Sequence, residues 1–119
     1  MAYLEDPIAF YHAIDSLIIT SRFEGLPFSV LGAIACNLPR VLNDVPGLRR
    51  FRCYQLDQLH MVPKENLEST AEALNQSVNS PASGCNLRET GLQIFSLEAV
   101  YSRIADRYES VLEPVSSRL

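Results

Sequence analysis

The hydrophobic positions of this chain fall into short continuous runs separated by stretches with helical spacing. Residues 17–20 (LIIT) form a continuous, β-branched apolar run, which is typical of a strand covered on both faces in a parallel sheet. Two further short strands are expected at 40–43 (RVLN) and 59–62 (LHMV). Apolar spacing and start signals predict helices at 8–14, at about 27–36, at about 65–79, at 87–95 and at about 97–112.

Sequence signals also predict how several elements end and which faces they bury. The helix at 27–36 is apolar almost all round and is expected to be buried, with Asn37 in a left-handed cap and Pro39 preventing its continuation. Pro46 and Gly47 predict a type II turn. The helices at about 65–79 and 97–112 are each predicted to carry an apolar stripe on one face. The first stripe comprises Leu67, Ala71, Leu74 and Val78, and the second comprises Leu97, Tyr101, Ile104, Tyr108 and Leu112.

The order of these elements predicts the fold class. Strand–helix–strand units at this spacing imply a parallel sheet with right-handed crossovers. The chain is therefore expected to be an α/β protein, a three-layer Rossmann-like partial domain with a short parallel sheet of about three strands and flanking helices. Because 119 residues have room for one domain, residues 1–119 are read as a single partial domain.

Composition and charge narrow the function classes. Hydrophobic residues make up 47% and charged residues 20%, which is typical of a folded globular chain. The net charge of -4 argues against a nucleic-acid partner. No apolar run approaches a membrane span and the N-terminus does not resemble a signal peptide, so a cytoplasmic location is expected. The basic run Arg49, Arg50 and Arg52 favours a solvated face, while peripheral contact with an acidic membrane surface or a phosphate stays open.

The cysteine and histidine residues predict neither a metal site nor a disulfide framework. Cys36, Cys53 and Cys85 are widely spaced without a Cys-x-x-Cys pair, and neither histidine completes a ligand cluster. On the first predicted helix, His12 is expected to be a packing residue. Tyr11, Tyr101 and Tyr108 are expected to be half-buried core residues whose hydroxyls reach water.

Residues 21–28 (SRFEGLPF) join the first predicted strand to a helix and carry the candidate chemistry. In open parallel sheets, ligands bind beyond the carboxyl ends of the strands, and unpaired N–H groups at a helix start favour a phosphate. Gly25 lets the backbone approach such a ligand closely, and the Glu24 carboxylate suits the hydroxyls of a sugar. A diphosphate at the helix start with a sugar at Glu24 is the arrangement that binds a nucleotide sugar.

Several runs in the same order resemble a known family. They are DSLIITSRFEGLP (15–27), VL (30–31), AIACNLP (33–39), the glycine-containing DVPGL (44–48) and FSLE (95–98). Together they resemble the C-terminal, donor-binding part of retaining GT-B glycosyltransferases of the family-four type (glycosyl transferases group 1). The resemblance implies transfer of a sugar from a UDP- or GDP-sugar to a glycan or lipid-linked acceptor, as in polysaccharide biosynthesis, with no metal and no other cofactor.

The resemblance also assigns roles to single residues. Glu24 matches the glutamate that binds the transferred sugar, and Gly25 and Leu26 match backbone positions near the sugar and the diphosphate. The candidate donor-sugar and diphosphate site comprises Glu24, Gly25, Leu26, Pro27 and Phe28. Arg22 is a further diphosphate candidate, and no residue is assigned as catalytic.

Gly32 departs from the family pattern, because relatives have a second glutamate there that holds the nucleotide ribose. Three explanations stay open: the ribose is held otherwise, donor binding is weakened or lost, or the residue is an engineered change. The sugar, the base and the acceptor are not specified by the sequence.

The resemblance covers only the last part of a two-domain enzyme and lacks the acceptor-side domain. The isolated chain is therefore expected to be inactive, and its nucleotide-sugar donor and acceptor meet only in the intact parent. In the family's sheet order the strand at 17–20 is central, whereas here it has an open edge, which predicts self-association. The alternative function is a non-catalytic α/β remnant or a partner-binding module.

Overall fold

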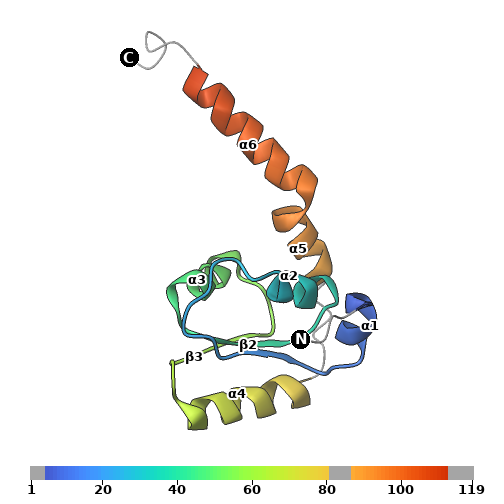
Figure 1. The fold of residues 1–119 in the computed structure, drawn as a ribbon, viewed down its shortest axis with the longest axis vertical. Coiled ribbons are helices and arrows are strands. Elements are labelled where there is room, and N and C mark those ends of the chain that lie inside the picture. Colours follow the sequence, from blue (N-terminus) through green and yellow to red (C-terminus); the bar gives the residue numbers. More distant parts are fainter. Residues whose placement is uncertain (1–4, 81–86, 113–119) are drawn as a thin grey trace.

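Three parallel strands form one sheet in the order β1, β2, β3 in the computed structural model, which describes residues 5–80 and 87–112 (Figure 1). The strands are β1 (Leu17–Ile19), β2 (Arg40–Asn43) and β3 (Leu59–Val62). Their register places Ile18 beside Val41 and Val41 beside His60. The three strands predicted from the apolar runs are confirmed, and so is their parallel arrangement.

The five predicted helices lie close to their predicted ranges, whereas α3 and η1 within residues 46–54 were not predicted. Polar residues explain where several helices begin and end. Asp6 caps the first helix by accepting a hydrogen bond from the N–H of Ile8 at 3.0 Å. Asn66 likewise accepts from the N–H of Ser69 at 2.9 Å. Asn37 has φ 57°, so the predicted left-handed cap is confirmed. The helices are α1 (Pro7–His12), α2 (Phe28–Ala35), α3 (Pro46–Arg49), the 3-10 helix η1 (Arg50–Tyr54), α4 (Leu67–Asn79), α5 (Leu87–Phe95) and α6 (Leu97–Leu112).

Helices cover both faces of the sheet and give the three layers that the element order predicted. On one face, α4 packs on β2 and β3 around a small cluster of Val41, Val62 and Ala73. The opposite face holds the main core, and α2 and α3 lie on that side (Figure 1). The buried residues of the main core are Val30, Ile34, Leu42, Val45, Leu48, Phe51, Leu56 and Leu87. The α/β, Rossmann-like partial fold is confirmed.

The prediction that β1 is covered on both faces is wrong. Leu17 and Ile19 pack against the main core, but Ile18 is 41% exposed. Ile18 shares a face with its neighbour Val41, which α4 covers, yet α4 packs on β2 and β3 and leaves β1 uncovered. β1 therefore buries one face and lies at an open edge of the described sheet.

The apolar stripe predicted on one face of α4 does not face the sheet. Its members, Leu67, Ala71, Leu74 and Val78, are all exposed. The helix faces the sheet with Ala73 and Ser77 instead, because small side chains let it lie close to β2 and β3. The hydroxyl of Ser77 is also 3.0 Å from the hydroxyl of Ser16, which joins α4 to the start of β1.

The apolar stripe predicted on α6 faces solvent, and the prediction that Tyr101 and Tyr108 are half-buried core residues is wrong. Its residues Leu97, Tyr101, Ile104, Tyr108 and Leu112 are between 46% and 79% exposed. α6 contains no buried residue, contacts α5 and extends away from the sheet (Figure 1). Helical spacing thus identified an apolar face without identifying what lies against it. Across residues 5–80 and 87–112, no helix has the length and apolarity needed to cross a membrane.

Three local expectations also need correction. Pro46 and Gly47 begin α3 and do not form a type II turn, since Gly47 has no positive φ. α2 is not buried all round, because Phe28 is 85% exposed and Ala35 is exposed too. His12 is exposed on the last turn of α1 and is not a packing residue.

Arg40 on β2 is fully buried, which the sequence did not lead us to expect. Its guanidinium donates hydrogen bonds to the carbonyl oxygens of Leu38 at 3.1 Å and Asp57 at 2.6 Å. Burial lowers the pKa of Arg40 to about 10, against an opposing attraction to Asp57, so the group stays charged at neutral pH. Arg40 therefore ties together the segments that lead into β2 and β3.

Candidate functional site

A hollow lies at the carboxyl ends of β1 and β2, where the loop before α2 meets the loop before α3. It is lined by Phe23, Glu24, Gly25, Pro46 and Gly47 and has a volume of about 310 Å³. Such an edge of a parallel sheet is where α/β proteins bind ligands. The structure thus brings Glu24 and Gly25 together with Pro46 and Gly47, which the sequence separates by about twenty residues.

Glu24 is one of the residues that line this hollow. The side chain is half-buried, and among the described residues it has no hydrogen-bond or ion-pair partner. Gly25 beside it is exposed and has open space where a Cβ atom would stand. An unpaired carboxylate accepts hydrogen bonds and suits a ligand that carries hydroxyl groups.

The start of α2 is open to solvent beside Glu24. Pro27 is the N-cap residue, and no side chain caps this helix. Leu26 is 41% exposed and Phe28 is 85% exposed, so the segment that leads into α2 is not enclosed by packing. The free N–H groups of the first turn and the positive end of the helix dipole favour an anionic group here.

Arg22 does not line the hollow. Its guanidinium forms an ion pair with Glu65 at 2.8 Å, and both side chains are largely exposed. An ion pair of this kind is screened by water and contributes little to stability.

Asp44, at the end of β2, holds two of the three arginines of the basic run. One carboxylate oxygen accepts a hydrogen bond from Nε of Arg49, and the other accepts from Arg52 at 3.1 Å. The hydrogen bond from Arg49, helped by the charge of Arg52, holds the pKa of Asp44 below its usual range. We call these three residues the Asp44 clamp. The sequence analysis missed it, although an acid followed by arginines five and eight residues later was a usable signal.

The Asp44 clamp predicts a pH-dependent stability. Because the folded pKa of Asp44 lies below its unfolded value, the unfolded chain binds the proton first on acidification. The stabilisation is present above roughly pH 4 and is lost as pH falls through the folded pKa. In urea unfolding at a series of pH values, the stability difference between wild type and Asp44→Asn should shrink toward about pH 3. A difference that is the same at neutral and acid pH would contradict this assignment.

Gly32 on α2 faces the ring of Tyr11 from α1. A Cβ atom at position 32 would lie 2.5 Å from two carbon atoms of that ring. Tyr11 is half-buried, as predicted, and its hydroxyl donates to the carbonyl oxygen of Ser29 at 3.2 Å. Burial raises the pKa of Tyr11. Any side chain at position 32 therefore requires Tyr11 to move, a contact that periodicity does not reveal.

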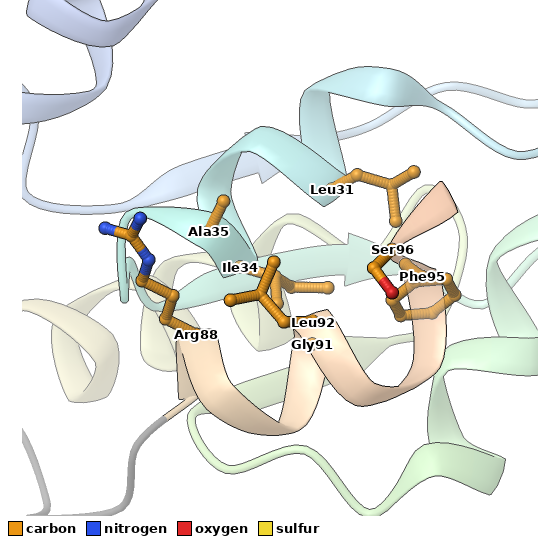
Figure 2. Close-up of a pocket in the computed structure, with 8 residues that line it drawn as sticks. All are labelled: Leu31, Ile34, Ala35, Arg88, Gly91, Leu92, Phe95 and Ser96. Atoms are coloured by element: carbon orange, nitrogen blue, oxygen red, sulfur yellow. The ribbon is translucent and has the colours of Figure 1, made fainter. Parts of the chain in front are cut away.

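A second cavity, between α2 and α5, is a packing seam rather than a candidate site (Figure 2). Its volume is about 200 Å³, and it is lined by Leu31, Ile34, Ala35, Arg88, Gly91, Leu92, Phe95 and Ser96. Arg88 is the one charged residue in this lining and lies at its end beside Ala35 (Figure 2). No loop at the ends of the strands contributes to it, so it offers no arrangement of polar groups for chemistry.

The described residues contain no cluster of three or more metal-ligating side chains. Cys36 and Cys53 are free thiols, and Cys85 lies outside the described residues.

Comparison with known proteins adds one finding to this geometry. The family model described as "Glycosyl transferases group 1" matches residues 2–93, a range that includes the whole sheet and both loops of the hollow. No curated protein and no solved structure matches the chain.

Proposed function

The chain belongs to the group 1 glycosyltransferases, and we propose that the hollow at the ends of β1 and β2 is its site for a nucleotide-sugar donor. One observation carries this proposal: Glu24, whose carboxylate has no partner among the described residues, lines the hollow and stands a few residues before the uncapped start of α2. A carboxylate suits sugar hydroxyls, and a helix start suits a diphosphate, so the pair complements a sugar joined to a diphosphate.

In this proposal each part of the site has one task. The Glu24 carboxylate accepts hydrogen bonds from hydroxyls of the donor sugar and orients it. The backbone from Gly25 through Phe28 faces the diphosphate, whose negative charge grows as the sugar leaves, and the helix start stabilises that charge. The donor is a UDP- or GDP-sugar, and the sugar passes with retention to a glycan or lipid-linked acceptor. No further cofactor is included in the proposal.

Donor binding and transfer are separate properties in this proposal. The hollow is open to solvent on the side of Phe23, which is 89% exposed. Transfer requires that two substrates be oriented together and shielded from water. The isolated chain is therefore expected to bind donors and to leave transfer to the intact parent.

Removing the Glu24 carboxylate should weaken the part of donor affinity that depends on the sugar. We expect Glu24→Ala to bind UDP or GDP as the wild type does and the corresponding UDP-glucose or GDP-mannose about tenfold more weakly, since a hydrogen bond to a charged group is worth about 1.5–3 kcal/mol. Calorimetric titration and amide chemical shifts of residues 21–28 would measure this.

Glu68→Ala is the matched control, because Glu68 is an exposed glutamate on α4 outside the hollow. It should leave every affinity unchanged. If the wild type binds none of UDP, GDP, UDP-glucose and GDP-mannose at millimolar concentration, the donor site is refuted and a non-catalytic module is favoured.

The second candidate function, a partner-binding module, is favoured by the open edge of β1. The N–H of Leu17 donates to Pro39 on the β2 side at 2.9 Å, so Ile18, next along the strand, turns its backbone groups to the open edge. The side chain of Ile18 is also 41% exposed. Unpaired apolar edges promote strand pairing, and in this proposal the partner is a second copy of the chain.

Sedimentation at increasing concentration should therefore show self-association of the wild type. Ile18→Lys should weaken that association at least about tenfold, because a charge on an edge strand opposes pairing. Tyr101→Lys places the same charge on the exposed helix α6 and should leave the self-association of the chain unchanged. A wild type that stays monomeric, or association abolished by Tyr101→Lys alone, would contradict this expectation.

A further inference from the structure

We infer that Gly47 is a positioning residue: because it has no side chain, the backbone of Glu24 rests against the start of α3, and this contact sets where the Glu24 carboxylate stands in the hollow. The consequence for ligand binding rests on the proposed donor site, whereas the contact itself does not.

The contact between Gly47 and the loop before α2 is closer than any other residue would permit. A Cβ atom on Gly47 would overlap the carbonyl oxygen and carbon of Glu24 and lie 2.8 Å from the carbonyl oxygen of Gly25. These are backbone atoms, so no change of rotamer relieves the overlap. Gly47 has no positive φ, which means that the approach of Glu24, and not the dihedral angle, requires glycine here.

The segment that carries Gly47 is firmly held. Val45 and Leu48 on either side of it are buried in the main core. The N–H of Asp44 donates to the carbonyl oxygen of Val62 at 2.8 Å, and the carboxylate of Asp44 is held by the Asp44 clamp. A side chain added to Gly47 would therefore not be accommodated by movement of α3.

The loop that carries Glu24 has fewer attachments. Phe23, Gly25 and Leu26 are exposed. The amide of Asn43 donates to the carbonyl oxygen of Ser21 at a long 3.4 Å, at the beginning of this loop. When Gly47 gains a methyl group, this loop is the part that moves, and it takes the carboxylate of Glu24 with it.

The test compares two alanine variants that introduce similar steric conflicts in different places. Gly47→Ala pushes against the loop of the hollow. Gly91→Ala pushes against the side chain of Ile34 in the seam between α2 and α5. Two properties are measured in the full chain: the amide chemical shifts of residues 23–26 without ligand, and the ratio of the affinities for UDP-glucose and UDP, or for GDP-mannose and GDP.

Gly47→Ala should shift the amides of residues 23–26 and lower the affinity ratio about tenfold, as expected when a charged hydrogen bond is misplaced. Gly91→Ala should lower the melting temperature and leave both properties as in the wild type. Asp44→Asn serves as a second variant if Gly47→Ala does not fold. It loosens the Asp44 clamp without adding bulk and should move the same amides in smaller measure.

Each outcome decides one of the two proposals. Unchanged amides of residues 23–26 in both Gly47→Ala and Asp44→Asn, or equal effects of the two glycine variants, would overturn the role of Gly47. A wild type that binds none of the four nucleotides refutes the donor site. If the amide shifts of residues 23–26 nevertheless change in Gly47→Ala and not in Gly91→Ala, the contact that positions Glu24 is supported independently of ligand binding.

Discussion

Replacing Arg40 with alanine is expected to lower the free energy of unfolding by about 3–5 kcal/mol, because two buried carbonyl acceptors lose their donor and a large buried side chain is removed. Arg40 is fully buried, and its guanidinium satisfies the carbonyl oxygens of Leu38 and Asp57. Alanine removes both hydrogen bonds and leaves a cavity between β2 and the segment before β3. Urea unfolding followed by tyrosine fluorescence would measure the loss, since Tyr54 packs against Phe95 in the core with ring centroids 4.9 Å apart.

Arg40→Met separates the effect of charge from the effect of volume. Methionine fills most of the space and does not bury a charge, so it should recover about half of the stability that alanine loses. An alanine variant within about 1 kcal/mol of the wild type would mean that Leu38 and Asp57 find water or other partners, and would contradict the role assigned to Arg40.

Gly32→Glu is expected to destabilise the chain by about 1–3 kcal/mol, the usual effect of adding atoms to a packed site. The new side chain would meet the ring of Tyr11, whose carbon atoms lie 2.5 Å from the Cβ position. In a Tyr11→Ala background the same change should be tolerated, so a double-mutant cycle should give a favourable coupling between the two substitutions. Thermal and urea unfolding of the four proteins would measure it.

The same pair of substitutions tests whether nucleotide binding is weakened because Gly32 stands where relatives have a glutamate. If the missing carboxylate is what weakens the hold on the nucleotide ribose, Tyr11→Ala with Gly32→Glu should bind UDP or GDP about tenfold more tightly than Tyr11→Ala alone. A tolerated glutamate that brings no gain in affinity would mean that the missing carboxylate at position 32 does not limit nucleotide binding. A Gly32→Glu single variant as stable as the wild type would contradict the steric argument.

Strands and helices were predictable from this sequence because their signals are local. The apolar runs at β1, β2 and β3 and the cap Asn37 depend on neighbours a few residues away. The family resemblance was recognisable for the same reason, since its most specific residues lie within 11–48. The donor site itself stays a prediction that the ligand titrations test.

Buried faces and long-range contacts were not predictable from the same signals. The predicted apolar stripe on α4 includes Leu74 and Val78, whereas Ala73 and Ser77 face the sheet. Periodicity shows that an apolar face exists and does not show what packs against the helix. Gly47 follows a proline, a common turn signal, but its real constraint is a backbone contact from a loop more than twenty residues earlier in the chain. Such steric requirements appear only in three dimensions.

Because α6 extends from the sheet with none of its residues buried, the chain should not melt as a single cooperative unit. A lone helix of 16 residues is marginal in water, so its ellipticity should fade gradually while the β-sheet core still gives a sharp transition. The calorimetric enthalpy would then exceed the van't Hoff value, and one unfolding constant would describe the core without describing the whole polypeptide.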